Sequence, residues 1–130
     1  MPIRKLIDII AAKTGPNVLV THDPAAPGMD HIPEMSVHYV ELPPGGEIMP
    51  HTHNRVEAYL FLTGRATVMT GDEIAEVTTG DVAYAPIGVP HGIRVIGTEP
   101  LRFYAFNSPP SSTAPVVPAA EEVLWRWKRL

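Results

Sequence analysis

Two histidines and a glutamate stand at the head of a strongly apolar run, in the stretch GGEIMPHTHNRVEAYLFLTG. Side chains alternate across a β-strand, so His51 and His53 are expected to point to the same face. Glu57 begins the next strand, EAYLFL, which is apolar on both faces beyond it. Burying a carboxylate and two imidazoles without partners would cost several kcal/mol. Because imidazole nitrogen and carboxylate oxygen are natural donors to a divalent cation, the pattern predicts a metal site in a β core.

Short strands are the elements expected to position these residues. The chain has 15 prolines and 10 glycines in 130 residues, which favours many turns over long helices. Strand-like runs recur from residue 36 to residue 107 at intervals of about 8 to 12 residues, with turn residues between them. We therefore expect one all-β domain, a sandwich or barrel, with its core at about residues 36–107.

A short helix is expected at each end of the chain. Residues 3–13 carry apolar side chains at helical spacing. In the C-terminal extension, 108–130, Val123, Leu124 and Trp127 share one helical face after a stretch of low complexity. The predicted N-terminal helix packs against the domain. The C-terminal helix packs there as well, forms a dimer contact or covers the mouth of the barrel.

Composition and charge argue against several classes of protein. The formal net charge is −4 and the isoelectric point is about 5.8, so no basic field attracts nucleic acid or an anionic membrane. No apolar run approaches the roughly 18 residues that a membrane-spanning helix needs. Without cysteine, thiolate nucleophiles, disulfides and cysteine-ligated metal sites are excluded. Asp8 interrupts the only apolar stretch near the N-terminus, so we expect no signal peptide and a cytoplasmic protein.

Two segments resemble the two sequence motifs of the cupin family. The first motif is glycine, five residues, His-x-His, three residues, glutamate, six residues and glycine. The second is GDVAYAPIGVPH in this chain. The matching residues are Gly45, His51, His53, Glu57 and Gly64 in the first motif, and Gly80, Pro86, Gly88 and His91 in the second. The chain departs from the second motif at Val95, where cupins usually have an asparagine that is not a metal ligand.

The resemblance implies a fold, a metal site and an assembly. The fold would be a cupin double-stranded β-helix, or jelly-roll barrel, in a single domain spanning residues 1–130. His51, His53, Glu57 and His91 would hold one divalent transition metal, and the chain would commonly form a homodimer. Three imidazoles and one carboxylate suit Mn, Fe, Ni, Co, Cu or Zn better than calcium or magnesium. On an octahedral ion, four protein ligands leave about two positions for substrate, water or oxygen.

Strand parity predicts which other side chains face the metal. Met49, Phe61, Tyr84 and Ile93 are expected to line a substrate site, together with Arg55, which lies in the loop between His53 and Glu57 and could clamp an anionic substrate. Tyr59 and His38 are the candidate catalytic side chains. His38 shares strand parity with Val40, so it acts as a proton shuttle or partner of a ligand, or else is an ordinary buried histidine.

These expectations favour a small metalloenzyme that acts on a chelating organic molecule. A dioxygenase-type oxidation is the first predicted reaction, because the predicted lining contains few acid–base groups away from the metal. Isomerase, lyase and decarboxylase reactions follow. The alternative is a cupin that binds or senses a small molecule without changing it.

Overall fold

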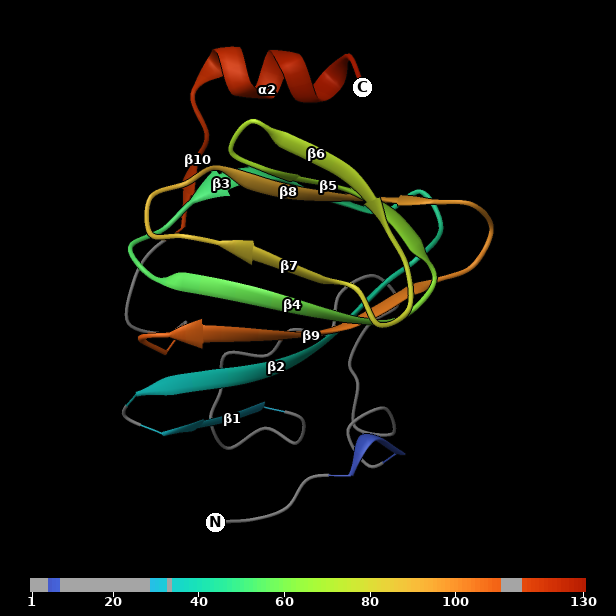
Figure 1. Ribbon diagram of the computed structural model, residues 1–130, viewed down its shortest axis with the longest axis vertical. Coiled ribbons are helices and arrows are strands. Elements are labelled where there is room, and N and C mark those ends of the chain that lie inside the picture. The colour runs from blue at the N-terminus through green and yellow to red at the C-terminus, as the bar shows by residue number, and fades with distance from the viewer. Residues whose placement is uncertain (1–4, 8–28, 33, 111–115) are drawn as a thin grey trace.

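The computed structural model describes residues 5–7, 29–32, 34–110 and 116–130. Two antiparallel five-stranded sheets face each other across the core, and one short helix lies on the outside (Figure 1). No ladder between described strands joins the two sheets into a closed barrel, but the arrangement is that of a jelly roll. The predicted all-β jelly-roll fold is thus confirmed. Of the expected N-terminal helix, Leu6 and Ile7 are helical and most of its other residues lie outside the described ranges.

The first sheet has the strand order β1-β2-β9-β4-β7. It contains the strand of the candidate ligand Glu57. Its strands are β1 (Met29–Ile32), β2 (Met35–Leu42), β4 (Val56–Thr63), β7 (Val82–Ala85) and β9 (Leu101–Ser108). Strand β9 lies between β2 and β4, so residues far apart in the sequence face the same interior.

The second sheet has the strand order β10-β3-β8-β5-β6. It contains the strands of the candidate ligands His51 and His91. Its strands are β3 (Glu47–Thr52), β5 (Arg65–Thr70), β6 (Glu73–Val77), β8 (His91–Ile96) and β10 (Val117–Pro118). The β5–β6 hairpin turns at Gly71 and Asp72, and Gly71 has a φ of 61°, which suits the tight turn.

The core forms because inward side chains of the two sheets alternate with outward ones. In β4 the inward positions are Tyr59 and Phe61, at 4% and 0% exposure, and in β9 Phe103 is fully buried against them. Ile93 of β8 closes the same cluster from the second sheet. These residues form the apolar core between the two sheets. The candidate metal ligands lie at the strand ends beside this core.

Helix α2 (Glu121–Lys128) covers the outer face of the second sheet (Figure 1). Its buried residues are Val123 and Trp127, and Trp127 packs with Met69 of β5. Arg94 of β8 lies 4.5 Å from the Trp127 ring centroid and donates hydrogen bonds to the carbonyl oxygens of Trp127 and Leu130. The predicted C-terminal helix is therefore confirmed, packed against the domain. None of the described helices is long or apolar enough to cross a membrane.

A first prediction concerns Gly64, the last glycine of the first motif. Its φ is +88°, and a Cβ there would lie 2.5 Å from the Pro100 carbonyl oxygen. Because this neighbour is backbone, it cannot move aside cheaply. We expect Gly64→Ala to lower the free energy of unfolding by more than about 2 kcal/mol.

Chemical denaturation of the metal-free protein measures this effect. Gly45→Ala is the matched control, since Gly45 has a φ of +75° but no atom within 4 Å of an added Cβ. The control isolates the cost of the left-handed backbone, about 1 kcal/mol. Equal losses in the two variants would contradict the close approach at Gly64.

Candidate metal centre

Three strands from the two sheets bring the candidate ligands together. His51 near the end of β3 is paired in register with His91 at the start of β8, so their side chains are cross-strand neighbours. His53 follows β3 directly, and Glu57 is the first inward residue of β4 in the facing sheet. One donor atom from each of the four residues lies within 4.8 Å of the others.

Three of the donors are spaced as a bound ion would hold them. Glu57 Oε1 lies 3.0 Å from His53 Nε2 and 3.1 Å from His91 Nε2, and the two histidine nitrogens are 3.1 Å apart. Donors about 2.1 Å from one ion and about 90° apart lie about 3.0 Å from each other, whereas tetrahedral donors lie about 3.4 Å apart. The triangle thus fits one face of an octahedron.

Backbone carbonyl groups orient all three imidazoles. His51 Nδ1 lies 2.9 Å from the Met49 carbonyl oxygen, and His53 Nδ1 lies 3.1 Å from that of Arg55. His91 Nδ1 lies 2.9 Å from the Val89 carbonyl oxygen. A carbonyl can only accept, so each Nδ1 carries the proton and each Nε2 presents a lone pair. This is the tautomer that a metal-binding imidazole needs.

The resulting set of acceptors calls for a cation. His53 Nε2, His91 Nε2 and Glu57 Oε1 each present lone pairs at about 3 Å from one another, and all three side chains are buried. Such groups repel one another unless extra protons or a metal ion lie between them. A shared proton bridges only two of these three atoms, whereas one metal ion contacts all of them, so a metal ion is the better fit. The donor set therefore fits a divalent transition metal, with His51 Nε2 as the fourth donor.

Glu57 is held in its charged form by its neighbours. Without a metal ion, burial alone raises the pKa of Glu57, but a proton shared with His53 or His91 and a hydrogen bond from Tyr59 outweigh it and keep the pKa well below the usual value. The Tyr59 hydroxyl donates to Glu57 Oε1 over 2.7 Å. Burial, followed by the charge of Glu57, raises the pKa of Tyr59 well above its usual value. Tyr59 therefore stays protonated and acts as a donor that orients a ligand, not as a base.

A second prediction follows from the environment of His51. Burial, with repulsion from His91 as the second cause, lowers the pKa of His51 from 6.5 to about 4. Below pH 6.5 the unfolded chain therefore binds a proton at this residue that the folded chain does not bind. We expect the metal-free protein to lose stability as the pH falls from 6.5 to about 4, and this contribution to level off below that.

Urea denaturation in the presence of a chelator at pH 7, 5.5 and 4.5 measures this slope. Other groups also titrate in acid, so the comparison is with His51→Gln, which should show a shallower loss over the same range. Glu57 adds its own loss only below its unfolded pKa of 4.5. Identical slopes in the two proteins would contradict the burial of His51.

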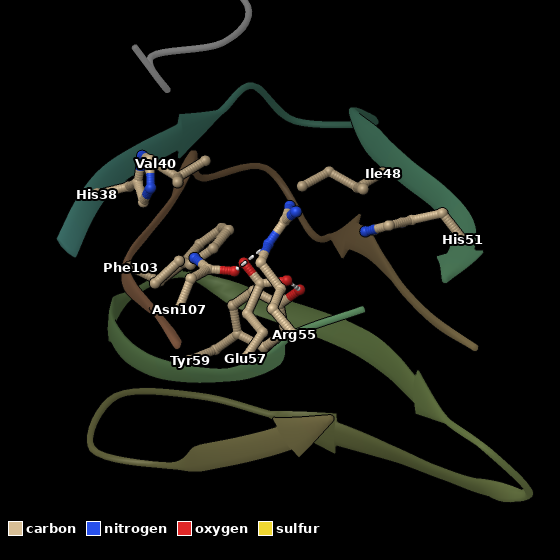
Figure 2. Close-up of a pocket in the computed structure, with 10 residues that line it drawn as sticks. His38, Val40, Ile48, His51, Arg55, Glu57, Tyr59, Phe103 and Asn107 are labelled. Atoms are coloured by element: carbon tan, nitrogen blue, oxygen red, sulfur yellow. Dashed lines mark hydrogen bonds between the residues drawn. The ribbon is translucent and has the colours of Figure 1, made fainter. Parts of the chain in front are cut away.

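A cavity of about 90 Å³ opens beside these ligands. Figure 2 shows His38 and His51 on opposite sides of it, with Arg55 reaching between them. Its lining residues are His38, Val40, Ile48, His51, Arg55, Glu57, Tyr59, Phe103, Ala105 and Asn107. The cavity is thus apolar except where the metal donors, His38, the Tyr59 hydroxyl and the Arg55–Asn107 pair face it.

The structure brings three of the predicted substrate and catalytic residues to this cavity, His38, Tyr59 and Arg55. His38 is 2% exposed, and its Nε2 lies 3.1 Å from Ser36 Oγ. Phe61 and Ile93 point inward as expected but belong to the packed core and do not line the cavity.

The expected inward orientation of Met49 and Tyr84 is wrong. Between Ile48 and His51 the pairing of β3 with β8 shifts register, so Ile48 faces the cavity and Met49 is 38% exposed. Tyr84 pairs with Ala58 on the outer face of the first sheet and is 55% exposed. Its small neighbours, Ala83 and Ala85, are the inward residues of β7.

Asn107 is the functional candidate that sequence reasoning missed. It is 2% exposed, and its Oδ1 accepts a 2.8 Å hydrogen bond from Arg55 Nε. In LRFYAFNS the inward positions run Leu101, Phe103, Ala105 and Asn107, so one polar residue ends an apolar face. The same signal had identified Glu57, and it could have identified Asn107.

The fold is a jelly roll and its His₃Glu cluster suits a metal ion, and together these features are typical of the cupin class. A model of the cupin domain matches residues 38–107, more than half of the chain, and the chain belongs to this family. An uncharacterized protein of Streptomyces coelicolor is 37% identical over 78 residues, which cover 60% of this chain and 73% of that protein.

Two further similarities concern an activity and the fold. Dimethylsulfoniopropionate lyase DddW of Ruegeria pomeroyi is 37% identical over 76 residues, which cover 58% of this chain and 49% of the lyase. The chain thus matches about half the length of that enzyme. A crystal structure of a Klebsiella pneumoniae protein with a double-stranded β-helix domain has a TM-score of 0.68 at 19% identity. That similarity covers 85% of this chain and 95% of the other, and it supports the fold alone.

Proposed function

We propose that the protein is a metal-dependent enzyme that cleaves a small chelating organic molecule in a lyase-type reaction. The observation that carries this proposal is the placement of His38. A buried histidine that is not a metal donor lies across a cavity of about 90 Å³ from His51. A substrate in this cavity therefore contacts a metal site on one side and a proton acceptor on the other.

The residues have separate roles in this reaction. His51, His53, Glu57 and His91 would hold a divalent ion, which would supply positive charge to stabilise negative charge on a substrate oxygen. His38 accepts a proton from a substrate carbon, the electron pair of that C–H bond forms the new double bond, and the leaving group departs with its own bonding pair. Ser36, 3.1 Å from the His38 ring, holds the imidazole in position. The apolar residues Val40, Ile48 and Phe103 keep bulk water from the reacting atoms.

The relative with a named reaction supports this choice. Dimethylsulfoniopropionate lyase DddW is 37% identical over the aligned residues. An elimination also needs no second substrate. That suits a small cavity, of about 90 Å³.

A dioxygenase-type oxidation is the second candidate, and the donor geometry favours it. Two histidines and one carboxylate on a single octahedral face are typical of iron(II) oxygenases. With His51 as a fourth donor, about two positions remain for a substrate and oxygen.

A substrate screen with and without oxygen tests the proposal. Protein loaded with manganese, iron, nickel or zinc is incubated with small organic acids, amides and alcohols, dimethylsulfoniopropionate included. We expect one compound to be cleaved equally fast under air and under argon. His38→Gln should lower kcat at least about 100-fold without changing metal content.

Tyr84→Phe is the matched control, because Tyr84 lies on the outer face of the first sheet, and it should leave kcat unchanged. Consumption of one oxygen molecule per turnover would replace the lyase with the dioxygenase. Tight binding of a compound that is returned unchanged, with no turnover in the panel, would instead support a binding or sensing cupin.

A further inference from the structure

Inward side chains of the first sheet form rows that run across its strands. In the middle row, Ala105 of β9 pairs in register with His38 of β2 on one side and with Tyr59 of β4 on the other. All three residues are buried, at 2% to 4% exposure, and all three line the cavity beside the candidate metal ligands. Because neighbouring strands lie about 4.8 Å apart, the backbones that carry His38 and Tyr59 are about 10 Å apart, with only a methyl group between the two side chains. Ala105 is therefore the floor of a slot between them.

The rows on either side of Ala105 form the two ends of this slot. In the row toward the metal centre, Glu57 pairs with Asn107, and both are polar and line the cavity. In the row toward the core, Phe103 pairs with Phe61, and both rings are fully buried. A molecule in the slot thus has candidate metal donors at one end and aromatic hydrocarbon at the other.

An alanine at this position costs stability. A small side chain that faces an open space forfeits the contacts that a larger apolar side chain would make there. Two residues earlier on the same inward face, Phe103 makes such contacts with the rings of Tyr59 and Phe61. A larger β-branched residue would also suit a strand better than alanine does. Losses of this kind are typical of positions where binding a ligand matters more than stability.

We infer that Ala105 is a specificity-determining residue, which admits an unbranched carbon of the substrate between His38 and Tyr59. The substrate class is then a narrow chelating compound whose carbon next to the metal-binding group carries hydrogen atoms and no branch. That carbon lies beside His38, the proton acceptor, so the slot that selects the substrate also presents its C–H bond. The inference rests on the proposed function for placing a substrate in this cavity.

Calorimetric titration of the zinc-loaded protein with two hydroxamates tests the slot without relying on turnover. Propionohydroxamate and isobutyrohydroxamate have the same chelating group, and the second has an extra methyl group on the carbon next to it. We expect the wild type to bind propionohydroxamate at least tenfold more tightly, since one methylene in an apolar pocket changes binding by about 10- to 200-fold. Ala105→Gly should reduce this preference to about threefold or less, because it removes the methyl group that the branch would meet.

Ala105→Val should close the slot. Its branched side chain fills the space between His38 and Tyr59, so propionohydroxamate should bind at least tenfold more weakly than to the wild type. Azide binds zinc without a hydrocarbon body, and its affinity should stay within about twofold. The melting temperature of the metal-free variant should not fall, because the added groups fill an open space. A substitution that only disrupted the sheet would lower the melting temperature and weaken both ligands.

Ala83→Val is the matched control. Ala83 pairs with Tyr59 from the opposite side and is also an inward alanine of the first sheet. It lines a separate cavity of about 310 Å³, so the added groups have room away from the slot. Both hydroxamates should bind this variant as they bind the wild type. Zinc content shows whether each variant retains the metal centre.

The outcomes separate this inference from the proposed function. Equal affinities of the two hydroxamates for the wild type, or an unchanged preference in Ala105→Gly, would overturn the role of Ala105. Undiminished binding of propionohydroxamate to Ala105→Val would do the same. If Ala105→Val fails to retain zinc, the wild type and Ala105→Gly decide alone. Absence of turnover in the substrate screen would count against the proposed function and leave these binding results unaffected.

Discussion

Replacing His53 with alanine lowers the affinity for a divalent metal at least about 100-fold, because the substitution removes one of the three donors that lie 3.0 to 3.1 Å apart. The effect exceeds that of removing a residue that only orients a ligand, which typically costs 10- to 100-fold. Tyr59→Phe is such a change, since Tyr59 donates to Glu57 without touching the ion site directly. We therefore expect the order of affinities to be wild type, then Tyr59→Phe, then His53→Ala.

Competition titration with a chromogenic chelator measures these affinities, and unfolding of the metal-free proteins serves as the control. Without metal, His53→Ala removes one of several mutually repelling acceptors, so its stability should fall less than that of an ordinary core truncation. Unchanged metal affinity in His53→Ala would exclude the proposed centre.

Truncating Trp127 should destabilise the protein without affecting that centre. Trp127 is fully buried between α2 and the second sheet, where Arg94 lies against its ring and Met69 packs beside it. We expect Trp127→Ala to lower the free energy of unfolding by about 3–5 kcal/mol. The metal donors belong to strand ends of the domain and not to α2, so metal affinity should stay within about twofold of the wild type under folding conditions.

Trp125→Ala is the matched control for this prediction. Trp125 is on the same helix but 56% exposed, with the Arg129 guanidinium 3.8 Å from its ring centroid. Its removal should cost less than about 1 kcal/mol. Denaturation monitored by circular dichroism gives both values. A loss of similar size in the two variants would show that α2 is not anchored through Trp127.

The candidate metal donors could be predicted because their spacing in the sequence determines which of their side chains share a face of the sheet. His51 lies near the end of β3, His53 follows that strand directly and Glu57 is the second residue of β4, so their spacing of two and four residues was enough to predict that they lie together. Adding His91 required the family motif, since its cross-strand pairing with His51 joins segments 40 residues apart. Pairing of this kind follows from the sheet topology and not from any local pattern.

Alternation failed where the backbone departs from a regular strand. The register shift before His51 moves Met49 outward and Ile48 inward, and no residue type at those positions announces it. In β7, strand parity was taken to turn Tyr84 toward the substrate site, but the inward residues are Ala83 and Ala85. The contact between Arg55 and Asn107 joins residues 52 positions apart, so it too depended on the fold.

Arg55 contacts both a candidate metal ligand and a polar residue of the cavity wall. Its carbonyl oxygen lies 3.1 Å from His53 Nδ1 and sets that ligand's orientation, while its guanidinium contacts Asn107. Because one residue makes both contacts, a molecule that moves Arg55 when it binds in the cavity would also move this ligand. Linkage is reciprocal: the factor by which such a molecule tightens metal retention would equal the factor by which the metal tightens binding of that molecule. The protein would then release its ion most readily when its substrate is scarce.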